Sequence, residues 1–287
     1  MHNKFSYEIV KTPYDESLVV RFLYRTIPGR LVLKFLVRTT VSKLAGLIMD
    51  CQVSKLFVAG FVKRNRIDMD EYEKSEYKSF NDFFERKIKQ SRRVFPEARN
   101  IAAAPSDGKL TAYEIMPEGV FSIKHSKYSV AELLEDKALA KRLSGGICLI
   151  YRLAPSDYHR YAYIDDGEVV FSKKIRGILH TVRPIAHHQY AVYAQNSREY
   201  EVVQSKNFGM IIQMEVGALF VGKINNHEQG AIVKRGEEKG YFRYGASTIV
   251  MLFEKESINL DPEIYSNTRL GRETIVKMGD PIGSAPQ

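Results

Sequence analysis

A pair of hydroxyl residues stands just before an apolar run near the C-terminal end of the chain. Ser247 and Thr248 follow Gly245 and Ala246 and lead into IVMLF, a run typical of a buried strand. A serine in this place is either a hydrogen-bonded structural group or a nucleophile, and residue type alone favours the structural role. Since the surrounding residues do not form Gly-x-Ser-x-Gly, the sequence disfavours the nucleophile of an α/β-hydrolase.

The other residue types that a serine nucleophile needs occur upstream. His159 lies in LAPSDYHR, after an apolar run and a proline-containing turn, and Asp107 lies in the turn-forming segment AAAPSDGKL. A histidine carries protons near neutral pH, and a carboxylate can orient it beside a hydroxyl. His180, in GILHTVRP, is a second candidate. All three are also common as structural residues, so residue type alone leaves both interpretations open.

The chain lacks the ligand spacing of a metal site. His187 and His188 are adjacent, and neighbours on a strand point to opposite faces of a sheet. There is no His-Glu-x-x-His segment, and the two cysteines, Cys51 and Cys148, lie far apart in the sequence. We therefore expect no metal and no disulfide framework, which suits a reducing cytoplasm.

The candidate residues fall in a part of the chain whose pattern is mostly β. From about residue 101 onward, apolar runs of strand length recur between turns rich in glycine, proline, asparagine and aspartate. These runs span 147–153, 168–171, 210–224 and 247–253. A helix is predicted only over 129–143, with Ser129 as its N-cap. Ser247 is therefore expected to begin a buried strand.

Residues 1–98 have a helical pattern instead. Pro28 suits the first turn of a helix, and Arg30, Lys34 and Arg38 then recur at every fourth position, which places them on one face. Apolar residues occupy much of the remaining surface. A basic stripe beside a wide apolar face is typical of a helix in a lipid interface, although a helix packed on its own domain shows the same pattern.

Composition and charge limit the classes of protein. The chain has 287 residues, of which 44% are hydrophobic, so it is long and apolar enough to fold around a core. Its net charge of +9 favours contact with a polyanion, either nucleic acid or an anionic lipid surface, although no nucleic-acid-binding segment is recognisable. The polar start does not resemble a signal peptide, and no apolar run reaches the length of a spanning helix. A soluble or peripheral protein that does not span a membrane is expected.

Five segments, taken in order, resemble the phosphatidylserine decarboxylase family. They are FNDFFER at 80–86, APSDG at 104–108, LAPSDYHR at 153–160, VGALFVGKI at 216–224 and GASTIVMLF at 245–253. The likeness covers roughly residues 75 to 285, while the N-terminus matches in character only. Pattern and resemblance together predict an α+β protein. A helical, amphipathic membrane-associating region, 1–98, is followed by a β-rich catalytic domain, 99–287.

The resemblance implies a self-cutting proenzyme. In the family, a serine at the position of Ser247 attacks the preceding carbonyl, here that of Ala246, and the resulting ester breaks by β-elimination. The products would be a β chain, 1–246, and an α chain, 247–287, which begins with a pyruvoyl group derived from Ser247. Such a group forms a Schiff base with the substrate amine and accepts the electrons that loss of CO₂ releases.

Two positions depart from the family's pattern. Ala246 stands where the family usually has glycine, which eases the strained backbone of an N-to-O acyl shift. Ala162 stands three positions after His159, where the family has its relay histidine. By resemblance, Asp107 is the charge-relay carboxylate of the cutting step and His159 returns a proton after decarboxylation. Either His159 also serves as the relay base, or His180 takes that role.

The resemblance also implies partners and a location. The substrate would be phosphatidylserine in an anionic membrane, reached from the cytoplasmic side of the cell membrane by a peripheral protein. The basic N-terminal region then favours an interfacial role. The two chains would remain together as an α/β heterodimer, with a dimer of these left open. Two alternatives stay in view: a membrane-binding homologue that does not process, suggested by Ala246 and Ala162, and a Ser-His-Asp hydrolase that uses an intact Ser247.

Overall fold

The structure is a computed structural model of the chain. It describes residues 7–11, 18–123, 126–187, 190–219, 223–228, 230–243 and 247–286. Ala246, on the carbonyl side of the expected cleavage bond, lies outside the described residues, as does His188. Ser247 lies within them.

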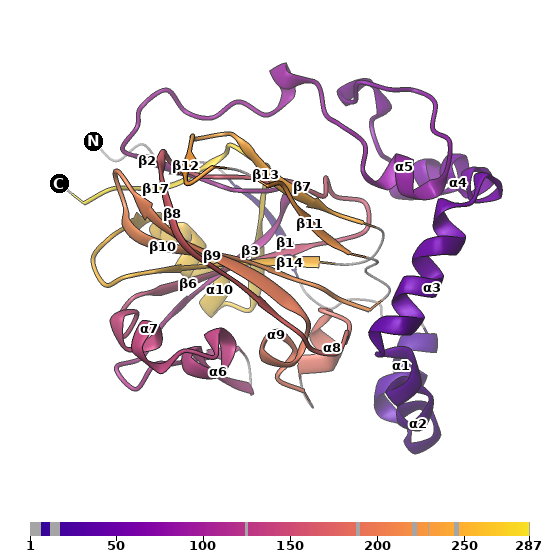
Figure 1. Ribbon diagram of the computed structural model, residues 1–287, viewed down its shortest axis with the longest axis horizontal. Coiled ribbons are helices and arrows are strands. Elements are labelled where there is room, and N and C mark those ends of the chain that lie inside the picture. The colour runs from indigo at the N-terminus through magenta and orange to yellow at the C-terminus, as the bar shows by residue number, and fades with distance from the viewer. Residues whose placement is uncertain are drawn as a thin grey trace.

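A nine-stranded antiparallel sheet forms the centre of the β-rich domain (Figure 1). Its strands, in spatial order, are β1 (Glu8–Lys11), β16 (Arg272–Val276), β3 (Gly108–Glu114), β6 (Ile147–Leu153), β14 (Ser247–Phe253), β10 (Gly209–Val216), β9 (Arg198–Ser205), β8 (Gly167–Ile175) and β12 (Ile232–Val233). The middle strand, β14, is buried at every position. Its continuous apolar sequence therefore reflects cover on both faces rather than the alternation of a half-exposed strand.

Three smaller sheets complete the β structure. They are β11 (Ile224–Asn226), β13 (Glu238–Phe242) and β7 (Arg160–Ala162); β15 (Asn259–Leu260), β17 (Pro281–Ser284) and β2 (Ile101–Ala103); and β4 (Val120–Ile123) with β5 (Ser126–Ser129). The first of these sheets covers the middle of the large sheet, because Gln213 of β10 donates from Nε2 to the carbonyl of Ala162 at 3.3 Å.

The two faces of the large sheet carry different side chains. Residues paired across antiparallel strands share a face, as do alternate residues along one strand, so Ser247 of β14 and Glu215 of β10 lie on the same face. This face meets β7 and β13, since Lys239 of β13 pairs with Glu215. The opposite face meets helix α6 (Val130–Leu134), where Arg198 of β9 donates to the carbonyl of Leu133.

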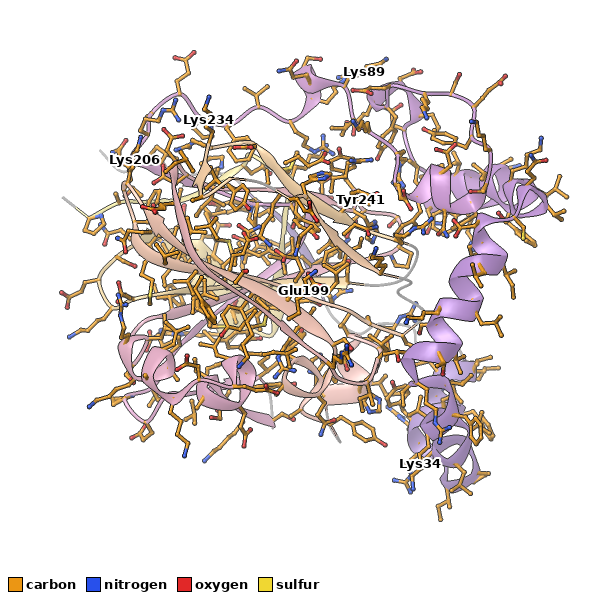
Figure 2. The ribbon with its side chains drawn as sticks, in the orientation of Figure 1. Lys34, Lys89, Glu199, Lys206, Lys234 and Tyr241 are labelled. Carbon is orange, nitrogen blue, oxygen red and sulfur yellow. The ribbon has the colours of Figure 1, made fainter. Side chains whose placement is uncertain are left out.

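Helices at the N-terminus stand beside the β-rich domain. They are α1 (Leu18–Arg25), α2 (Ile27–Leu36), α3 (Thr39–Asp50), α4 (Leu56–Asn65) and α5 (Phe80–Phe84), with short 3₁₀ helices at η1 (Gln52–Lys55), η2 (Met69–Glu71) and η3 (Gln90–Arg92). Pro28 lies in the first turn of α2, as predicted, and the Thr26 hydroxyl accepts from the backbone of Gly29 at 3.0 Å. Lys34 lies on α2, at the end of the helical region opposite α4 and α5 (Figure 2).

The helical region is joined to the β-rich domain near both ends of α3. At one end, the backbone N–H of Leu179 donates to the carbonyl of Val37 at 2.9 Å. At the other, Asn81 of α5 donates from Nδ2 to Asp50 at 2.9 Å, and Arg243 donates to the same carboxylate at 2.5 Å. The position of α3 relative to the large sheet is therefore fixed by contacts at two separated points.

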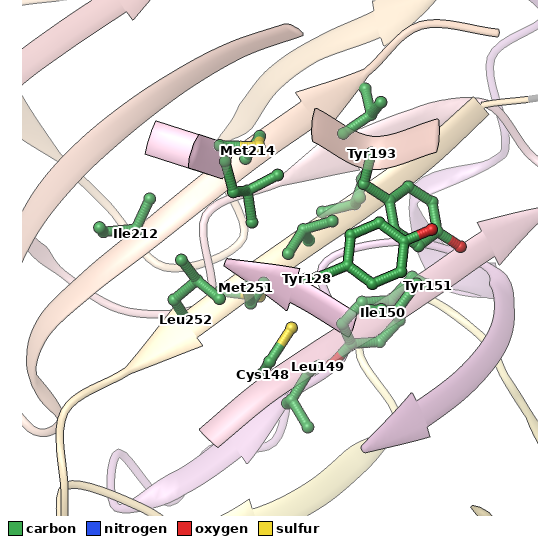
Figure 3. Close-up of a cluster of buried hydrophobic side chains, with 14 of the residues drawn as sticks. Tyr128, Cys148, Leu149, Ile150, Tyr151, Tyr193, Ile212, Met214, Met251 and Leu252 are labelled. Carbon is green, nitrogen blue, oxygen red and sulfur yellow. The ribbon is translucent and has the colours of Figure 1, made fainter. Parts of the chain in front are cut away.

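The remaining helices pack on the large sheet and enclose the core. They are α6, α7 (Lys137–Arg142), α8 (Pro184–His187), α9 (Val192–Gln195) and α10 (Pro262–Arg269). Figure 3 shows part of this core, where the rings of Tyr128 and Tyr193 lie 5.5 Å apart near Ile150 of β6 and Met214 of β10. Side chains from consecutive central strands thus meet the helices in one hydrophobic cluster.

The predicted α+β class is confirmed, while several boundaries differ. The first strand, β1, lies inside the region predicted as helical and pairs with β16 at the edge of the large sheet. The helix predicted over 129–143 is divided at Glu135, whose φ is 48°, although Ser129 caps its first half as expected. The apolar run 210–224 also divides, since β10 ends at Val216 and β11 begins at Ile224.

Among the residues that the structure describes, no single helix is long and apolar enough to cross a bilayer. One pair of consecutive helical segments in the described part, Thr39–Asp50 and Gln52–Asn65, has the length and composition of a spanning segment when taken together, but the two are bent by 75° relative to each other.

Candidate active site

Ser247 is the first residue of β14 and is fully buried. Ser247 pairs with Leu153 of β6 on one side. On the other side Thr248 pairs with Val216 of β10, so Gly217, which follows Val216, lies beside Ser247. Its Oγ has no hydrogen-bond partner among the described residues. A buried hydroxyl without a partner costs roughly 1–3 kcal/mol, so a hydroxyl left in this state points to a use other than stability.

His159 lies on the connection from β6 to β7, at the same end of the sheet as Ser247. The backbone N–H of Phe242, the last residue of β13, donates to the His159 carbonyl at 3.0 Å. Leu153, the last residue of β6, pairs with Ser247. The fold therefore brings His159 and Ser247 to the same end of the large sheet.

The ring of His159 is held in one orientation. Its Nδ1 lies 2.8 Å from the carbonyl oxygen of Asp157, and its ring centroid lies 4.0 Å from that of Phe84 in α5. Because a carbonyl only accepts, Nδ1 carries the proton of the neutral imidazole and Nε2 presents a lone pair. Among the described residues Nε2 has no partner, so a basic nitrogen is left available inside the protein.

Burial keeps this histidine neutral. It lowers the pKa of His159 to about 3, and the positive charge of Arg86 adds to the effect. Arg86 donates from Nη2 to the carbonyls of Ser156 and Asp157 at 3.0 and 3.2 Å, which also fixes the turn that carries the imidazole. At neutral pH His159 is therefore suited to accept a proton rather than to supply a charge.

Asp107 lies in the turn between β2 and β3 and is held by an arginine. Arg93 donates from Nε to Oδ1 at 2.8 Å and from Nη2 to Oδ2 at 2.6 Å, and the backbone N–H of Met278 donates to Oδ1 at 2.8 Å. No hydrogen bond joins Asp107 to His159 in the part of the chain that the structure describes. The group that orients His159 is the Asp157 carbonyl.

His180 lies on a segment that reaches the start of β14. Asn196 donates from Nδ2 to the carbonyls of His180 and Gly217 at 2.8 and 2.7 Å, and Gly217 lies beside Ser247 in the sheet. The imidazole stacks on Tyr190 at 4.0 Å between ring centroids, and its Nδ1 lies 3.3 Å from the hydroxyl of Tyr24. Burial lowers the pKa of His180 to about 4, so it is also neutral at physiological pH.

Comparison with known proteins agrees with this geometry. The family model for phosphatidylserine decarboxylase matches residues 80–284, which includes every strand around Ser247. The chain belongs to the phosphatidylserine decarboxylase family. It is 46% identical to phosphatidylserine decarboxylase proenzyme 2 of Clostridium acetobutylicum, over 92% of this chain and 91% of that protein.

Two further relatives carry the same name without the number. The phosphatidylserine decarboxylase proenzyme of Ruminiclostridium cellulolyticum is 41% identical over 91% of this chain and 89% of its own length. The proenzyme of Clostridium botulinum, strain Langeland, is 39% identical over 97% of this chain and 96% of its own length. The similarity therefore includes the N-terminal helices as well as the β-rich domain.

The position three residues after His159 is occupied by Ala162, beside a cavity. Ala162 lines a cavity of about 940 Å³ together with Arg93, and its backbone N–H donates to the carbonyl of Pro105 at 2.9 Å. Position 162 thus lies beside the turn that carries Asp107. In this chain Arg93 supplies the partner of that carboxylate.

A buried ionic cluster, which residue types and spacing did not reveal, shares the sheet face of Ser247. Glu215 pairs with Lys239, and Asn226 donates from Nδ2 to Glu215 at 3.1 Å and to Glu199 at 3.2 Å. Burial raises the pKa of Glu215 to about 7 although Lys239 opposes the shift. No sequence spacing links these residues, because they meet only when β10, β11 and β13 are stacked.

Other supporting residues carried weak signals in the sequence. Phe84 is one of three phenylalanines whose spacing at 80, 83 and 84 is typical of a core-facing helix, and its ring packs against that of His159. Asp157, within LAPSDYHR, accepts from the backbone N–H of Ala154 at 2.7 Å and pairs with Lys109 at 2.7 Å, which closes the turn before His159. The carboxylate of Asp157 thus accepts from a backbone N–H three residues earlier, and aspartate is a common turn residue, so a turn at this place agrees with the sequence.

Proposed function

We propose that this chain is a phosphatidylserine decarboxylase that cuts itself between Ala246 and Ser247 and converts phosphatidylserine to phosphatidylethanolamine and CO₂. The observation that carries the proposal is the buried, unpartnered Oγ of Ser247 at the first position of the central strand, next to a connection that carries a neutral histidine. Family membership supplies the reaction class, and this geometry supports it in the chain's own residues.

The cutting step begins with attack of the Ser247 Oγ on the carbonyl carbon of Ala246. The hydroxyl proton passes to a neutral imidazole, and the amide nitrogen of Ser247 takes a proton as its bond to the carbonyl breaks. The ester then eliminates: the α-proton of Ser247 and the carboxylate of Ala246 depart. Water converts the remaining dehydroalanine to a pyruvoyl group and ammonia. We assign the first proton transfer to His159 or His180.

Both histidines suit this assignment for different reasons. His159 presents an unpartnered, unprotonated Nε2, the form that a general base requires. His180 is tied through Asn196 to Gly217, the neighbour of Ser247. Asp107 is proposed to assist the cutting step from its turn beside Ala162, although its carboxylate is shared with Arg93.

The site around Ser247 fits a pyruvoyl group. The Ser247 Oγ is fully buried and makes no hydrogen bond among the described residues. Replacing this side chain by the carbonyl of a pyruvoyl group would therefore break no hydrogen bond that the fold uses. When formed, the pyruvoyl group supplies an electron sink for decarboxylation. Phe84 packs against the ring of His159. We assign to His159 the return of a proton to the substrate carbon after CO₂ leaves, from Nε2 once that nitrogen has taken up a proton earlier in the reaction.

The two chains are expected to stay together after cutting. The α chain, 247–287, contributes the central strand β14, which pairs with β6 from Ser247 to Phe253 on one side and with β10 on the other. Both neighbours belong to the β chain, 1–246. An α/β heterodimer is therefore proposed as the mature form.

We further propose that α1 to α4 rest on the anionic, cytoplasmic face of the cell membrane. Large apolar side chains are exposed along these helices, including Leu31 at 60%, Phe35 at 65%, Leu44 at 62%, Leu47 at 62% and Phe57 at 61%. Basic residues lie among them, at Arg30, Lys34, Lys43, Lys55 and Lys63. Exposed apolar area with interspersed cations is the composition of a helix in a lipid interface.

Intact-mass analysis of the purified protein tests the proposal. Two chains, 1–246 and 247–287, with a pyruvoyl group blocking the amino end of the shorter one, are expected. Incubation with phosphatidylserine vesicles should release CO₂. A single uncut chain that still binds vesicles would identify a non-processing homologue, and an uncut chain that hydrolyses esters would identify a Ser-His-Asp hydrolase.

A further inference from the structure

A basic pocket of about 270 Å³ lies where α3 meets the end of the large sheet. Lys43 of α3 lines one side, and Lys174 and Arg176, at and just after the end of β8, line another. Lys223 and Gly217 complete the part of the wall nearest the candidate active site. Three separate segments of the chain therefore place cations around one small space.

The charges in this pocket are unbalanced. Its acidic residue is Glu199, which pairs with Lys174 at 3.1 Å. A fifth basic residue, Arg198, directs its guanidinium to backbone carbonyls on the opposite face of the sheet. The side chains of Lys43, Arg176 and Lys223 are exposed and have no acidic partner within the described residues. These three cationic side chains together favour the binding of an anion.

The pocket adjoins the residues proposed to carry out the reaction. Gly217 lies beside Ser247 in the sheet, and Leu179, which also lines the pocket, immediately precedes His180. On its other side the pocket borders α3, where the neighbouring Leu44 is 62% exposed. An anion bound here would therefore lie between the lipid-facing helices and the start of β14.

We propose that this pocket binds the phosphodiester of the lipid headgroup, with Lys43, Arg176 and Lys223 as its cationic contacts. The inference rests on the proposed function, because the amine of the same headgroup must reach position 247. In phosphatidylserine the phosphodiester is separated from that amine by only a few bonds. A phosphate held beside Gly217 would direct the amine toward the first residue of β14.

The substrate's carboxylate is a less suitable occupant than its phosphate. Cations around the carboxylate would stabilise the ground state more than the transition state, in which that negative charge is being lost as CO₂, and so would slow the reaction. A phosphodiester keeps its charge throughout, and binding it anchors the substrate without that penalty.

Kinetics with a monomeric substrate test the proposal on the self-cleaved enzyme. Dihexanoyl phosphatidylserine below its micelle concentration removes any effect of the membrane on local concentration. Arg176→Gln and Lys223→Gln are each expected to raise KM roughly tenfold, as loss of one charge-assisted contact implies, with kcat within about twofold of the parent. Lys234→Gln is the matched control, because Figure 2 shows this lysine on the far side of the β-rich domain from α2, and it should leave KM unchanged.

Two inhibitors distinguish a lipid headgroup from free phosphate. Glycerophosphoserine and inorganic phosphate should both compete with the substrate, the former more strongly, and Arg176→Gln should weaken both. Inhibition by phosphate that is not competitive would show a separate phosphate site and overturn the assignment to the headgroup.

The outcomes also separate this inference from the proposed function. If the parent protein is cut and active but Arg176→Gln and Lys223→Gln keep its KM for the monomeric lipid, the pocket proposal is wrong and the decarboxylase proposal stands. If the parent protein is neither cut nor active, both are wrong. Because these side chains are exposed, melting temperatures close to that of the parent will show that the variants are folded.

Discussion

The Nδ1 atom of His159 lies 2.8 Å from the carbonyl oxygen of Asp157, two residues earlier in the same turn. A backbone carbonyl cannot take up the imidazole proton, so it fixes one tautomer without sharing charge. The carboxylate that a serine–histidine–aspartate arrangement would use is instead bound to Arg93. His159 is thus positioned by its own turn.

The first prediction concerns the pH dependence of self-cutting. Burial lowers the pKa of His159 to about 3, so its base form persists as the pH falls through 6.5, where an exposed histidine would become protonated. If His159 is the base, its protonation should change the rate of self-cutting little between about pH 5 and 8. The rate is measured on freshly translated protein by gel analysis of timed samples. A loss of rate centred near pH 6.5 would show that the relevant histidine is solvated.

Acid should also destabilise the folded chain through the same residue. The folded pKa lies below the unfolded value near 6.5, so the unfolded state binds more protons between about pH 6.5 and 3. The contribution of neutral His159 to stability is therefore present above pH 6.5 and is lost as pH falls through this window. Urea titrations of uncut Ser247→Ala protein measure the free energy of unfolding as the pH is lowered. Adding His159→Gln should make this free energy fall less with pH, whereas adding His227→Gln at an exposed position should not.

The second prediction separates two neighbouring hydroxyls. Ser247 and Thr248 are both fully buried, and neither hydroxyl has a partner among the described residues, but they point to opposite faces of the sheet. Ser247→Ala should abolish cutting and leave one chain of 32.9 kDa. Thr248→Ala removes the same group one position later and should still yield two chains. Cutting of the Ser247→Ala protein would refute the mechanism as a whole.

The third prediction addresses the relay base. If His180 takes the place left by Ala162, His180→Ala should slow cutting roughly a hundredfold, the lower range for loss of a general acid–base group. His227→Ala removes an exposed imidazole and serves as the control. Normal cutting by His180→Ala protein would leave His159 as the base for both the cutting step and decarboxylation.

A fourth prediction concerns the ion pair at Asp107. Its partner Arg93 has only 4% of its side chain exposed, and Asp107 has 11%. Arg93→Met leaves a buried carboxylate without its cation and should lower the free energy of unfolding by about 3–5 kcal/mol. Chemical denaturation of the uncut Ser247→Ala background gives the measurement.

The matching substitution on the other side of that pair separates catalysis from stability. Asp107→Asn retains the shape and one acceptor oxygen, so a relay role predicts slow cutting in a protein whose melting temperature is only modestly reduced. A purely structural role predicts the reverse, a lowered melting temperature with cutting at the parent rate.

The fifth prediction concerns the membrane. Attraction between the basic helices and anionic lipid is screened by salt, so binding to phosphatidylserine-containing vesicles should weaken as ionic strength rises. Phe35→Ser removes a 65% exposed apolar side chain from α2 and should weaken binding at every salt concentration. Co-sedimentation provides the assay. Salt-insensitive binding would mean that apolar insertion alone holds the protein on the bilayer.

Local sequence predicted those parts of the site that depend on short-range chemistry. Ser247 does begin a buried strand, because seven consecutive small or apolar residues need cover on both faces. His159 does follow a strand and a turn, since Asp157 closes that turn on Ala154. The order of five segments was enough to predict the family, which the comparisons confirm.

What could not be predicted depends on distant residues that meet only in the fold. Arg93 occupies a polar stretch before the β-rich domain, and nothing in its neighbourhood indicates Asp107 as its partner. Strand β1 is a short segment whose pairing with β16 is set by sequence more than 250 residues away. The pairing of Glu215 with Lys239 likewise requires two sheets to stack.

The central place of β14 has a consequence for the life of the molecule. Before cutting, the strand enters the sheet as part of one continuous chain, so its assembly is a unimolecular event. After the proposed cutting, the same strand would belong to a separate short polypeptide, and its return after loss would require a bimolecular encounter that depends on concentration. The proposed maturation would thus make unfolding effectively irreversible: the enzyme would fold once as a precursor, and its lifetime would then be set by how slowly that strand escapes.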